Sequence, residues 1–341
     1  MLNWYLQSGK DHDVVVSSRI RLARNIENIP FITKCTVEDY ETILKQIEEI
    51  TPRIGYGLKF IKLKDIDDLT KLTLTEKHLL SPEVALDEKK EDIGAILINE
   101  EENICIMINE EDHLRLQVFA SGFDIENLMN LAVEIDEKIG QNLNYAYHEQ
   151  YGFLTTCPTN VGTALRISVM VHLPALSVTG NVVKILETIN NFGMNIRGAY
   201  GENSSSSGNM YQISNKQTLG LTESELVKNL KVITEKIIEQ EREARKYLLK
   251  NSIDLEDRLY RSYGIFSNCK KISGGEAKKL LSDIKLGTDL GILEGLNDFK
   301  VRKLELYTKP ASLQKYLGEV LEADARDIKR AEVIKKIIKE E

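Results

Sequence analysis

The sequence predicts an α+β fold in which an antiparallel sheet flanked by helices precedes a C-terminal helical domain. Short strand-like segments follow one another closely between residues 58 and 119, which favours antiparallel pairing. After about residue 222 only helical patterns remain. A length of 341 residues is typical of two domains, and the change in pattern suggests residues 1–250 and 251–341.

The first strand is expected to run from Val14 towards Asn25. If this segment stays extended, side-chain alternation puts Arg19 and Arg21 on one face. Further strands are expected at 58–63, 93–98, 104–108, 114–119, 166–172, 194–200 and 210–214, and helices at 38–50, 125–139 and 182–191.

Two capping boxes mark helix starts in the second half of the chain. Thr222 with Glu225 predicts a long charged helix that ends near residue 250, and Ser273 with Glu276 predicts a helix through residue 284. No linker rich in Pro, Gly or Ser marks the domain boundary, which we therefore expect near residue 250 only from the change in pattern.

Composition excludes several classes of protein. The hydrophobic fraction of 42% is that of a globular chain, and the formal charge of −8 argues against general nucleic-acid binding. No apolar stretch is long enough to cross a bilayer. The four cysteines form no C-x-x-C pair and the five histidines show no metal spacing, so we expect a cytoplasmic protein without a protein-bound metal.

Several polar segments are candidates for a site. Arginines, which suit phosphate better than lysines do, recur in short Gly/Asn/Thr-containing segments, although scattered surface ion pairs would explain them equally well. Three acids lie in 109–115, where a solvated acidic turn is the alternative. Cys157 lies in a polar turn and could be structural or functional. No phosphate-binding glycine loop occurs, so side chains would have to hold any phosphate.

Four of these segments, taken in order, resemble the ATP:guanido phosphotransferase family, the phosphagen kinases. The matching stretches are 17–25, 109–115, 157–166 and 197–202 followed by 208–215. The first arginine motif begins at residue 17, without the helical domain that precedes it in the small-molecule kinases. The C-terminal region instead carries 257–264 and the R-D-x-x-R-A motif at 326–331, which resemble the bacterial protein arginine kinase branch.

The resemblance implies a phosphagen-kinase catalytic domain that binds ATP together with Mg²⁺. It assigns a base to Glu111, a second carboxylate to Glu202 and a group against the acceptor guanidinium to Cys157. The implied nucleotide-binding residues are Ser17, Ser18, Arg19, Ile20, Arg21, His78, Arg115, Arg166, Ile167, Ser168, Val169, Met170, Arg197, Gly198, Ala199, Tyr200, Gly201 and Glu202. From its surroundings alone, His78 would be an ordinary packed helix residue.

A second site is implied in the C-terminal domain. By resemblance, Arg326, Asp327, Arg330 and Ala331 form an allosteric phosphoarginine-binding site, and the same domain mediates dimerisation. Spacing alone favours ordinary pairing of Arg326 with Glu322 and of Arg330 with Asp327. The chain departs from the small-molecule kinases at Tyr200, where they have arginine, and from the branch in the four serines at 204–207.

The implied activity is a protein arginine kinase that transfers the γ-phosphoryl group of ATP to arginine side chains. The branch marks proteins for the Clp unfoldase and protease, inactivates a heat-shock repressor, and works with a zinc-binding activator protein; a homodimer is also expected, with no direct nucleic-acid or membrane partner. Two alternatives remain: a kinase for free arginine or another small guanidine, and a phosphoarginine-binding adaptor that has lost catalysis.

Overall fold

A computed structural model describes residues 3–198, 207–250 and 252–340 of the chain. Its centre is an eight-stranded sheet in the order β2-β3-β4-β5-β1-β8-β10-β9, in which every neighbouring pair is antiparallel. The predicted antiparallel sheet is therefore confirmed. The strands are β1 (Val15–Arg24), β2 (Lys59–Lys62), β3 (Ala95–Ile98), β4 (Ile104–Ile108), β5 (Leu114–Ser121), β8 (Leu165–His172), β9 (Met194–Gly198) and β10 (Met210–Asn215).

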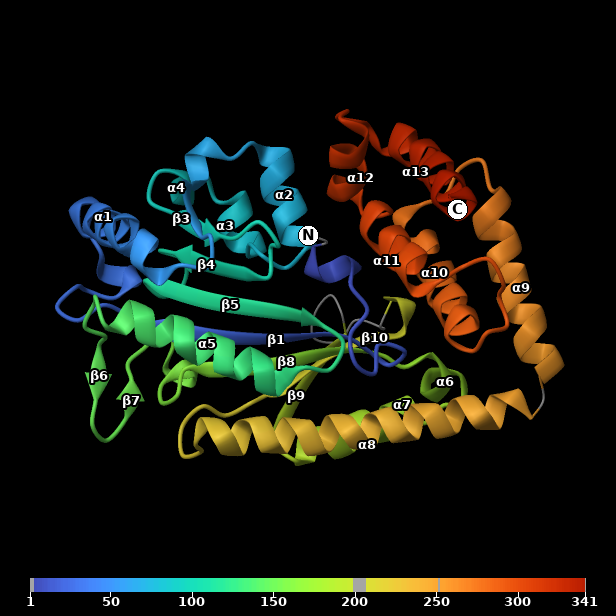
Figure 1. Ribbon diagram of the computed structural model, residues 1–341, viewed down its shortest axis with the longest axis horizontal. Coiled ribbons are helices and arrows are strands. Elements are labelled where there is room, and N and C mark those ends of the chain that lie inside the picture. The colour runs from blue at the N-terminus through green and yellow to red at the C-terminus, as the bar shows by residue number, and fades with distance from the viewer. Residues whose placement is uncertain (1–2, 199–206, 251, 341) are drawn as a thin grey trace.

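One face of the sheet carries the main hydrophobic core. Ile20 and Leu22 of β1 are fully or almost fully buried there, together with Ile135 of α5 (Ile125–Gly140) and Ile237 of α8 (Glu223–Leu249). In Figure 1 α5 and the long α8 run along this side of the sheet. Helices α1 (Val37–Ile54), α6 (Pro174–Val178) and α7 (Val182–Asn191) complete the layer, and a small hairpin of β6 (Tyr147–His148) and β7 (Gly152–Phe153) projects from its edge.

Three helices that the sequence patterns did not predict cover part of the opposite face. They are α2 (Asp68–Glu76), α3 (Pro82–Leu86) and α4 (Glu88–Glu91). Leu79 follows α2 and packs in a smaller core with Cys105 of β4 and Phe119 of β5. These helices are short, so their apolar periodicity is too brief to recognise in the sequence. Among the described residues, these helices leave the middle of this face, over β1 and β8, without a covering helix layer (Figure 1).

The C-terminal helices have a hydrophobic core of their own. They are α9 (Ser252–Asn268), α10 (Gly274–Asp289), α11 (Asp298–Tyr307), α12 (Pro310–Leu317) and α13 (Ala323–Lys339). Phe266, Ile284, Leu304 and Ile334 lie at its centre. The predicted capping box of Thr222 and Glu225 opens α8, which ends at Leu249. No helix in the described parts of the chain is both long and apolar enough to span a membrane.

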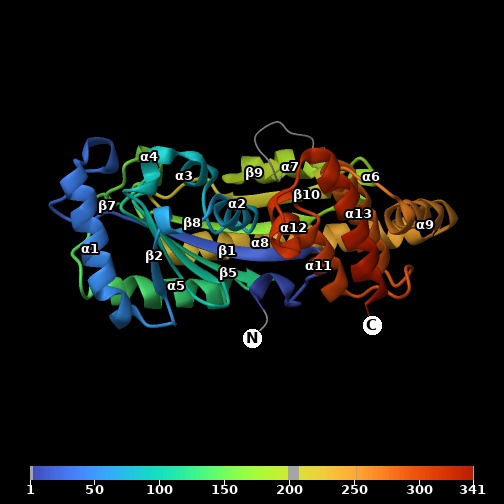
Figure 2. The same cartoon turned by 90° about the horizontal axis from the view of Figure 1, so that it is seen from above.

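The C-terminal helices pack at one end of the sheet, beside α2 (Figure 2). The carboxylate of Glu76, the last residue of α2, accepts hydrogen bonds from the backbone N–H groups of Ala311 (2.7 Å) and Ser312 (2.8 Å) at the start of α12. Lys309, the N-cap residue of α12, supplies no side-chain cap and instead donates to the backbone oxygen of Glu76. A residue of one domain thus caps a helix of the other.

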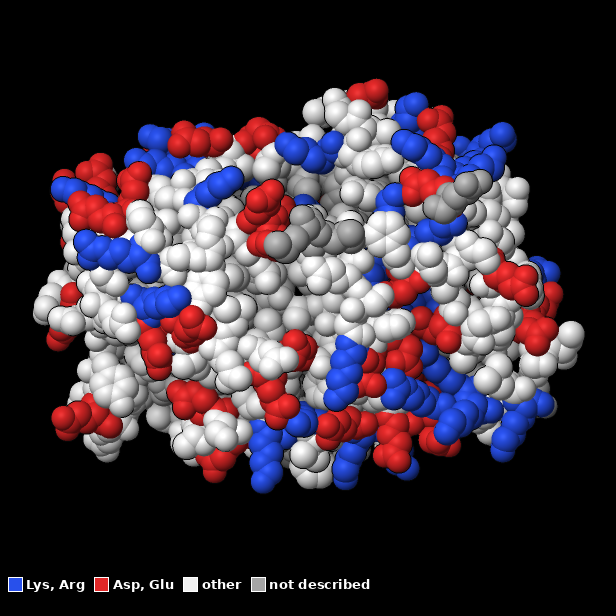
Figure 3. All heavy atoms as spheres, viewed as in Figure 1, with Lys and Arg blue, Asp and Glu red and all other residues white. Residues whose placement is uncertain are grey.

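Charged side chains join the domains at the other end of the contact. Arg245 of α8 pairs with Glu241 at 2.9 Å and approaches Asp289 of α10 at 3.7 Å, and Lys285 pairs with Asp289 at 3.0 Å. All four groups are buried or nearly so, which makes each dependent on its partners. On the face shown in Figure 3, blue and red side chains intermingle along the lower edge, where Figure 1 places α8.

Ile20→Ala tests the role of the central strand. Ile20 is fully buried in the main core, so its truncation should lower the free energy of unfolding by about 2–5 kcal/mol. Urea unfolding followed by circular dichroism measures this loss. Val232→Ala on the exposed face of α8 is the control and should change stability by less than about 0.5 kcal/mol; equal losses for the two variants would contradict the assignment of the core.

Candidate active site

Strand register brings the five predicted arginines to the open face of the sheet. Arg21 of β1 lies opposite Arg166 of β8, and Arg115 of β5 lies opposite Ala23 of β1. Arg19 and Arg21 are two residues apart on β1 and so share a face, as predicted. Arg197 of β9 pairs with Gln212 of β10, which pairs with Met170 of β8, and Met170 pairs with Ser17 on the same face.

Three of these guanidinium groups, those of Arg19, Arg21 and Arg166, are crowded and have few hydrogen-bond partners among the described residues. Burial, with repulsion from the neighbouring arginines, lowers the pKa of Arg19 and Arg21, and burial together with Arg197 and Arg115 lowers the pKa of Arg166. The Nε atoms of Arg21 and Arg166 are buried and have no hydrogen-bond acceptor among the described residues. Among the described residues, Arg166 donates to Ser214 alone (3.2 Å), and Arg19 Nε lies 3.5 Å from Ser168 Oγ. A polyanion such as a triphosphate fits these unused donors.

Acidic residues at the start of β5 face this cluster. Arg115 forms an ion pair with Glu110 at 2.5 Å and lies 3.8 Å from Glu111. The Glu111 side chain remains 42% exposed, whereas Glu110 and Asp112 are buried, so the segment is not simply a solvated acidic turn. Burial raises the pKa of Glu111, and the neighbouring carboxylates of Glu110 and Asp112 raise it further against the opposing effect of Arg115.

Asp112 fixes the loop that carries Cys157. Its carboxylate accepts hydrogen bonds from the side-chain amide of Asn25 and from the backbone N–H of Thr156, both at 2.7 Å. Thr155 donates to the carbonyl of Cys157 at 2.8 Å. The sequence motifs contain Asn25 and Asp112 but gave neither of them a role. Their contacts join segments far apart in the chain, for which one sequence gives no signal.

These segments enclose a cavity of about 200 Å³. Its wall includes Arg21, Arg115 and Arg166 together with Glu111 and Cys157. The Cys157 sulfur lies 3.0 Å from Thr159 Oγ1. The cavity therefore combines forked cations, a carboxylate with a raised pKa and a thiol, which suits phosphoryl transfer to a cationic nitrogen nucleophile.

A second cavity, of about 580 Å³, lies near Ser17, at the other end of the line that Ser17, Arg19 and Arg21 form on one face of β1. Ser17, Met170 and His78 line it, while Arg19 lies between Ser17 and Arg21 on β1. Four residues of extended strand span about 13 Å, so a nucleotide laid along β1 would place its nucleoside in this cavity and its phosphates over Arg19 and Arg21.

His78 is not the packed helix residue that its neighbours in sequence suggested. It follows the end of α2 with a positive φ of 62°, and its ring faces the second cavity. Loss of solvation among the surrounding groups, with repulsion from Lys309, Arg19 and Arg21, holds the pKa of His78 well below its usual range. The ring is therefore neutral at physiological pH and can pack against a neutral base.

Some predicted nucleotide-binding residues do not reach this face with their side chains. Ile20, Ile167 and Val169 are buried in the main core, and Ser18 accepts from Asp124 N–H and donates to the carbonyl of Gly122 on the same side. In each strand motif, only alternate side chains face the site. Gly198 ends β9, paired with Tyr211. Ala199, Tyr200, Gly201 and Glu202, and serines 204–206, lie outside the described residues.

Arg24 has a different role from its neighbours. It lies on the core side of β1, pairs with Asp136 at 2.7 Å, and packs 3.5 Å from the centre of the Phe153 ring. Arg24 therefore does not belong to the arginine cluster, because adjacent residues of a strand face opposite sides of the sheet.

The predicted phosphoarginine residues lie on α13, remote from the arginine cluster in the fold. Arg330 is 2% exposed and pairs with Asp327 at 2.5 Å, which was the alternative that needs no phosphate. Ala331 is buried, and Arg326 reaches the carbonyl of Leu321 at 3.4 Å rather than the Glu322 side chain. Arg326 and Arg330 thus do not point together at an open surface, and a phosphoarginine site here stays a prediction.

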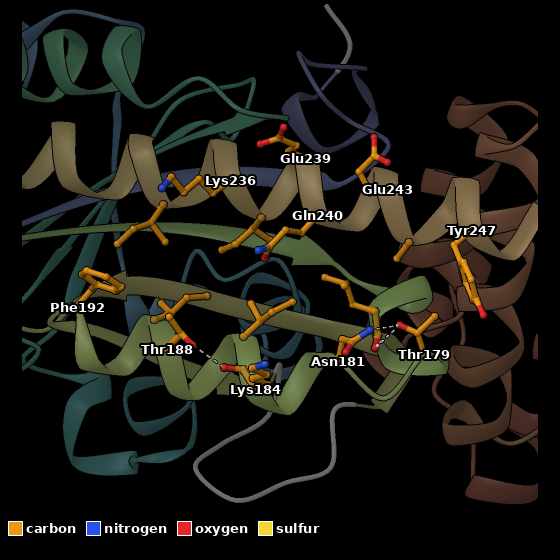
Figure 4. Close-up of a pocket in the computed structure, with 16 residues that line it drawn as sticks. Thr179, Asn181, Lys184, Thr188, Phe192, Lys236, Glu239, Gln240, Glu243 and Tyr247 are labelled. Atoms are coloured by element: carbon orange, nitrogen blue, oxygen red, sulfur yellow. Dashed lines mark hydrogen bonds between the residues drawn. The ribbon is translucent and has the colours of Figure 1, made fainter.

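A third hollow, of about 830 Å³, lies between α7 and α8. Aliphatic side chains such as Ile185, Ile189 and Ile233 form much of its wall, with Phe192 and Tyr247 towards its two ends (Figure 4). None of the five arginines borders it. Its lining is mainly apolar, and its cations are two lysines, Lys184 and Lys236, rather than a cluster of arginines (Figure 4). We therefore place the candidate active site at the other two cavities.

Comparison with known families agrees with this geometry. The family model described as ATP:guanido phosphotransferase, C-terminal catalytic domain, matches residues 40–244. The chain belongs to the ATP:guanido phosphotransferase family. A second model, described as the protein-arginine kinase McsB C-terminal domain, matches residues 252–341 and places the chain in the protein-arginine kinase branch of this family.

Similar proteins extend over nearly the whole chain. A protein-arginine kinase of Halothermothrix orenii is 46% identical, covering 98% of this chain and 95% of that protein. Those of Bacillus pumilus and Bacillus subtilis are 45% and 44% identical, covering 97% and 98% of this chain and 92% of each relative. The similarity to protein-arginine kinases therefore extends beyond the catalytic motifs to the C-terminal helices.

Solved structures of this family share the fold. A lombricine kinase superimposes with a TM-score of 0.60 at 24% identity, over 72% of this chain and 69% of that one. A duplicated taurocyamine kinase from Schistosoma mansoni, with bound components of a transition-state analogue, gives 0.61 at 25% identity over 77% of this chain and 38% of its own. The phosphagen-kinase α+β fold is thereby confirmed.

Two arginines of β1 should respond oppositely to replacement. Arg21→Met removes a crowded cation with an unpartnered Nε, so it should raise the free energy of unfolding in the absence of nucleotide by about 0.5–2 kcal/mol. Arg24→Met leaves Asp136 without its cation and should lower stability by about 3–5 kcal/mol. Urea unfolding without nucleotide measures both; a large loss in Arg21→Met would contradict the like-charge explanation.

Proposed function

We propose that this chain transfers the γ-phosphoryl group of MgATP to the guanidinium group of arginine side chains in proteins. The observation that carries the proposal is the 200 Å³ cavity in which three arginines meet Glu111 and Cys157. The names of the relatives, each a protein-arginine kinase, support arginine in proteins as the acceptor.

The arginines would bind and orient the phosphates. Arg19 and Arg21 lie in line along β1, and Arg115 and Arg166 flank them from the neighbouring strands. Their charges offset the negative charge on the oxygens of the transferred group, which is the main demand of phosphoryl transfer. Bound Mg²⁺ would add to this neutralisation through the nucleotide's own oxygens. No group of three His, Cys, Asp or Glu side chains able to hold a metal occurs in the described residues.

Glu111 would act on the acceptor. An arginine side chain is protonated at neutral pH, and its nitrogen must lose a proton as the N–P bond forms. The Glu111 carboxylate is partly exposed in the cavity and has a raised pKa, which brings its basicity closer to what a general base requires. Cys157 borders the same cavity and would contact the guanidinium, with Glu202 as a second carboxylate.

The biological setting is also proposed by resemblance. We infer a cytoplasmic enzyme, a homodimer, that works with a zinc-binding activator protein. Its products would be recognised by the Clp unfoldase and protease, and a heat-shock repressor would be one of its substrates. An allosteric phosphoarginine site at Arg326 and its neighbours on α13 would couple modification to activity.

Glu111→Gln should abolish phosphoryl transfer while leaving ATP affinity nearly unchanged. The amide keeps the shape of the side chain but cannot accept the proton, so kcat should fall at least about 100-fold. Transfer is measured with radiolabelled ATP and a protein acceptor, and affinity with a fluorescent ATP analogue. Parallel loss of binding and transfer would contradict the role of Glu111 as base.

The acid side of the pH profile should report on Glu111. Because burial and neighbouring carboxylates raise its pKa, kcat should fall as the pH drops through a value above the usual range of glutamate. Glu110→Gln removes one of these negative charges and frees Arg115, so it should move this fall to lower pH. An acid limb that stays in place, or moves upward, would contradict the assignment.

The product distinguishes the proposed reaction from its alternatives. After incubation with MgATP and a casein-like protein, mass spectrometry under non-acidic conditions should find acid-labile phosphate on arginine. The matched reaction with free arginine should give far less product. Preference for free arginine would indicate a small-guanidine kinase, and absence of ATP turnover together with retained phosphoarginine binding would indicate an adaptor.

A further inference from the structure

The 580 Å³ cavity, called the nucleoside cavity below, is lined by residues of both domains. Ser17, His78 and Met170 come from the catalytic domain. Facing them across the same cavity are residues of the C-terminal helices, namely Gly274, Gly275, Lys278, Leu281 and Ser282 of α10, Glu305 and Leu306 of α11, and Thr308 and Lys309 before α12. No motif of the catalytic domain accounts for this second wall.

We propose that the C-terminal helical domain forms one wall of the nucleoside-binding cavity, and that Arg330 of α13 positions this wall. The proposal rests on the proposed function, because it assumes that ATP lies along β1. It assigns the C-terminal domain a part in nucleotide binding, and it gives Arg330 a positioning role in addition to its place in the implied phosphoarginine site.

The composition of the cavity suits a purine nucleoside. Trp4, Met170, Leu281 and Leu306 offer apolar surface, while a few polar groups face the same space. Such a combination is typical of sites that bind flat ligands with several hydrogen-bonding edges. The cavity volume of about 580 Å³ falls in the usual range for such a ligand.

Glu305 is a polar group of this wall that can accept further hydrogen bonds. No described residue donates a hydrogen bond to its carboxylate or pairs with it within ion-pair distance. Burial raises its pKa, and the cations of Lys285, Arg302 and Lys309 oppose that effect. The carboxylate can accept from an N–H or O–H group of a nucleoside, and no partner within the protein would have to be displaced.

Arg330 holds the two segments from which this wall is built. Its Nε donates to the carbonyl of Thr308 and its Nη1 to the carbonyl of Ile272, both at 2.8 Å. The backbone N–H of Ile272 in turn donates to the carbonyl of Asp327 at 3.1 Å. Thr308 itself borders the cavity, and Ile272 is two residues from Gly274, which also borders it. Loss of this guanidinium would remove the side-chain contacts that join both segments to α13.

The α12 cap fixes the same wall against the catalytic domain. Glu76 binds the first N–H groups of α12, and His78 is two residues farther along the chain. Lys309, which borders the cavity, donates to the Glu76 carbonyl at 2.9 Å. The histidine and the opposite wall are therefore held in register by one short segment.

A cavity-filling variant tests the proposal in the full-length protein. Gly275 borders the cavity, and a Cβ added there meets no atom within 4 Å, so Gly275→Trp can occupy the space without forcing the backbone. Affinity for a fluorescent ATP analogue should fall at least about tenfold. Affinity for inorganic triphosphate, measured by competition, should stay within about twofold, because the arginine row is unaltered.

Gly264→Trp is the matched control. Gly264 is also a helical glycine whose added Cβ meets no atom within 4 Å, but it lies on the exposed side of α9 away from the cavity. Its affinity for the analogue should equal that of the wild type. Thermal unfolding of both variants checks that each is folded.

Arg330 is tested by separating KM from kcat. Arg330→Ala should raise the KM for ATP about tenfold with a much smaller change in kcat, and Arg330→Lys should recover part of the affinity. A purely structural role would instead lower the amount of active enzyme without changing the KM for ATP.

The outcomes separate this proposal from the proposed function. If the wild type binds MgATP and forms phosphoarginine while Gly275→Trp binds the analogue equally well, the second wall is wrong and the proposed function stands. If Gly275→Trp loses triphosphate and ATP analogue alike, a nucleoside-specific role is also wrong. If the wild type neither binds MgATP nor forms phosphoarginine, both proposals fail.

Discussion

The structure depends on a concentration of like charge that neighbouring acidic residues neutralise only in part. Five guanidinium groups project from one face of a sheet, and two of their Nε atoms are buried without an acceptor among the described residues. Such an arrangement opposes folding, and the large core on the other face must outweigh it. The same repulsion favours any ligand that brings several negative charges to the arginine row. The core-facing side chains of β1 thus contribute stability, whereas the arginines on its other face determine which ligand is preferred.

Acidic residues lie at one end of this charged face and distinguish the acceptor end from the nucleotide end. Glu110 binds Arg115, Asp112 ties the loop of Cys157 to Asn25, and Glu111 between them stays accessible. Three successive carboxylates therefore have three distinct environments, all within the turn that precedes β5. The acceptor end of the site is built from contacts between residues more than 40 positions apart in the chain.

Much of the sheet could be predicted because its patterns are local. Alternation on β1 placed Arg19 and Arg21 on one face, and the capping box of Thr222 marked the start of α8. Arg24 shows the limit of composition, because it resembles its neighbours in sequence but turns into the core to meet Asp136. The hydrogen bonds of Arg330 with Thr308 and Ile272 join residues far apart in the chain, so no local sequence pattern predicts them. The short helices around His78 likewise depend on tertiary packing rather than on a local pattern.

The cap that Glu76 gives to α12 makes a local requirement of one domain depend on the other. The first turn of α12 has no side chain of its own at the N-cap to satisfy its N–H groups, so separating the domains would expose these groups to water and fray the helix. Melting of either domain therefore removes a support from its neighbour, and the two would lose their structure in a single cooperative transition. An insertion between Glu76 and His78 would shift His78 relative to α12, which Glu76 caps. The length of this connection is therefore constrained as strictly as the identity of its residues.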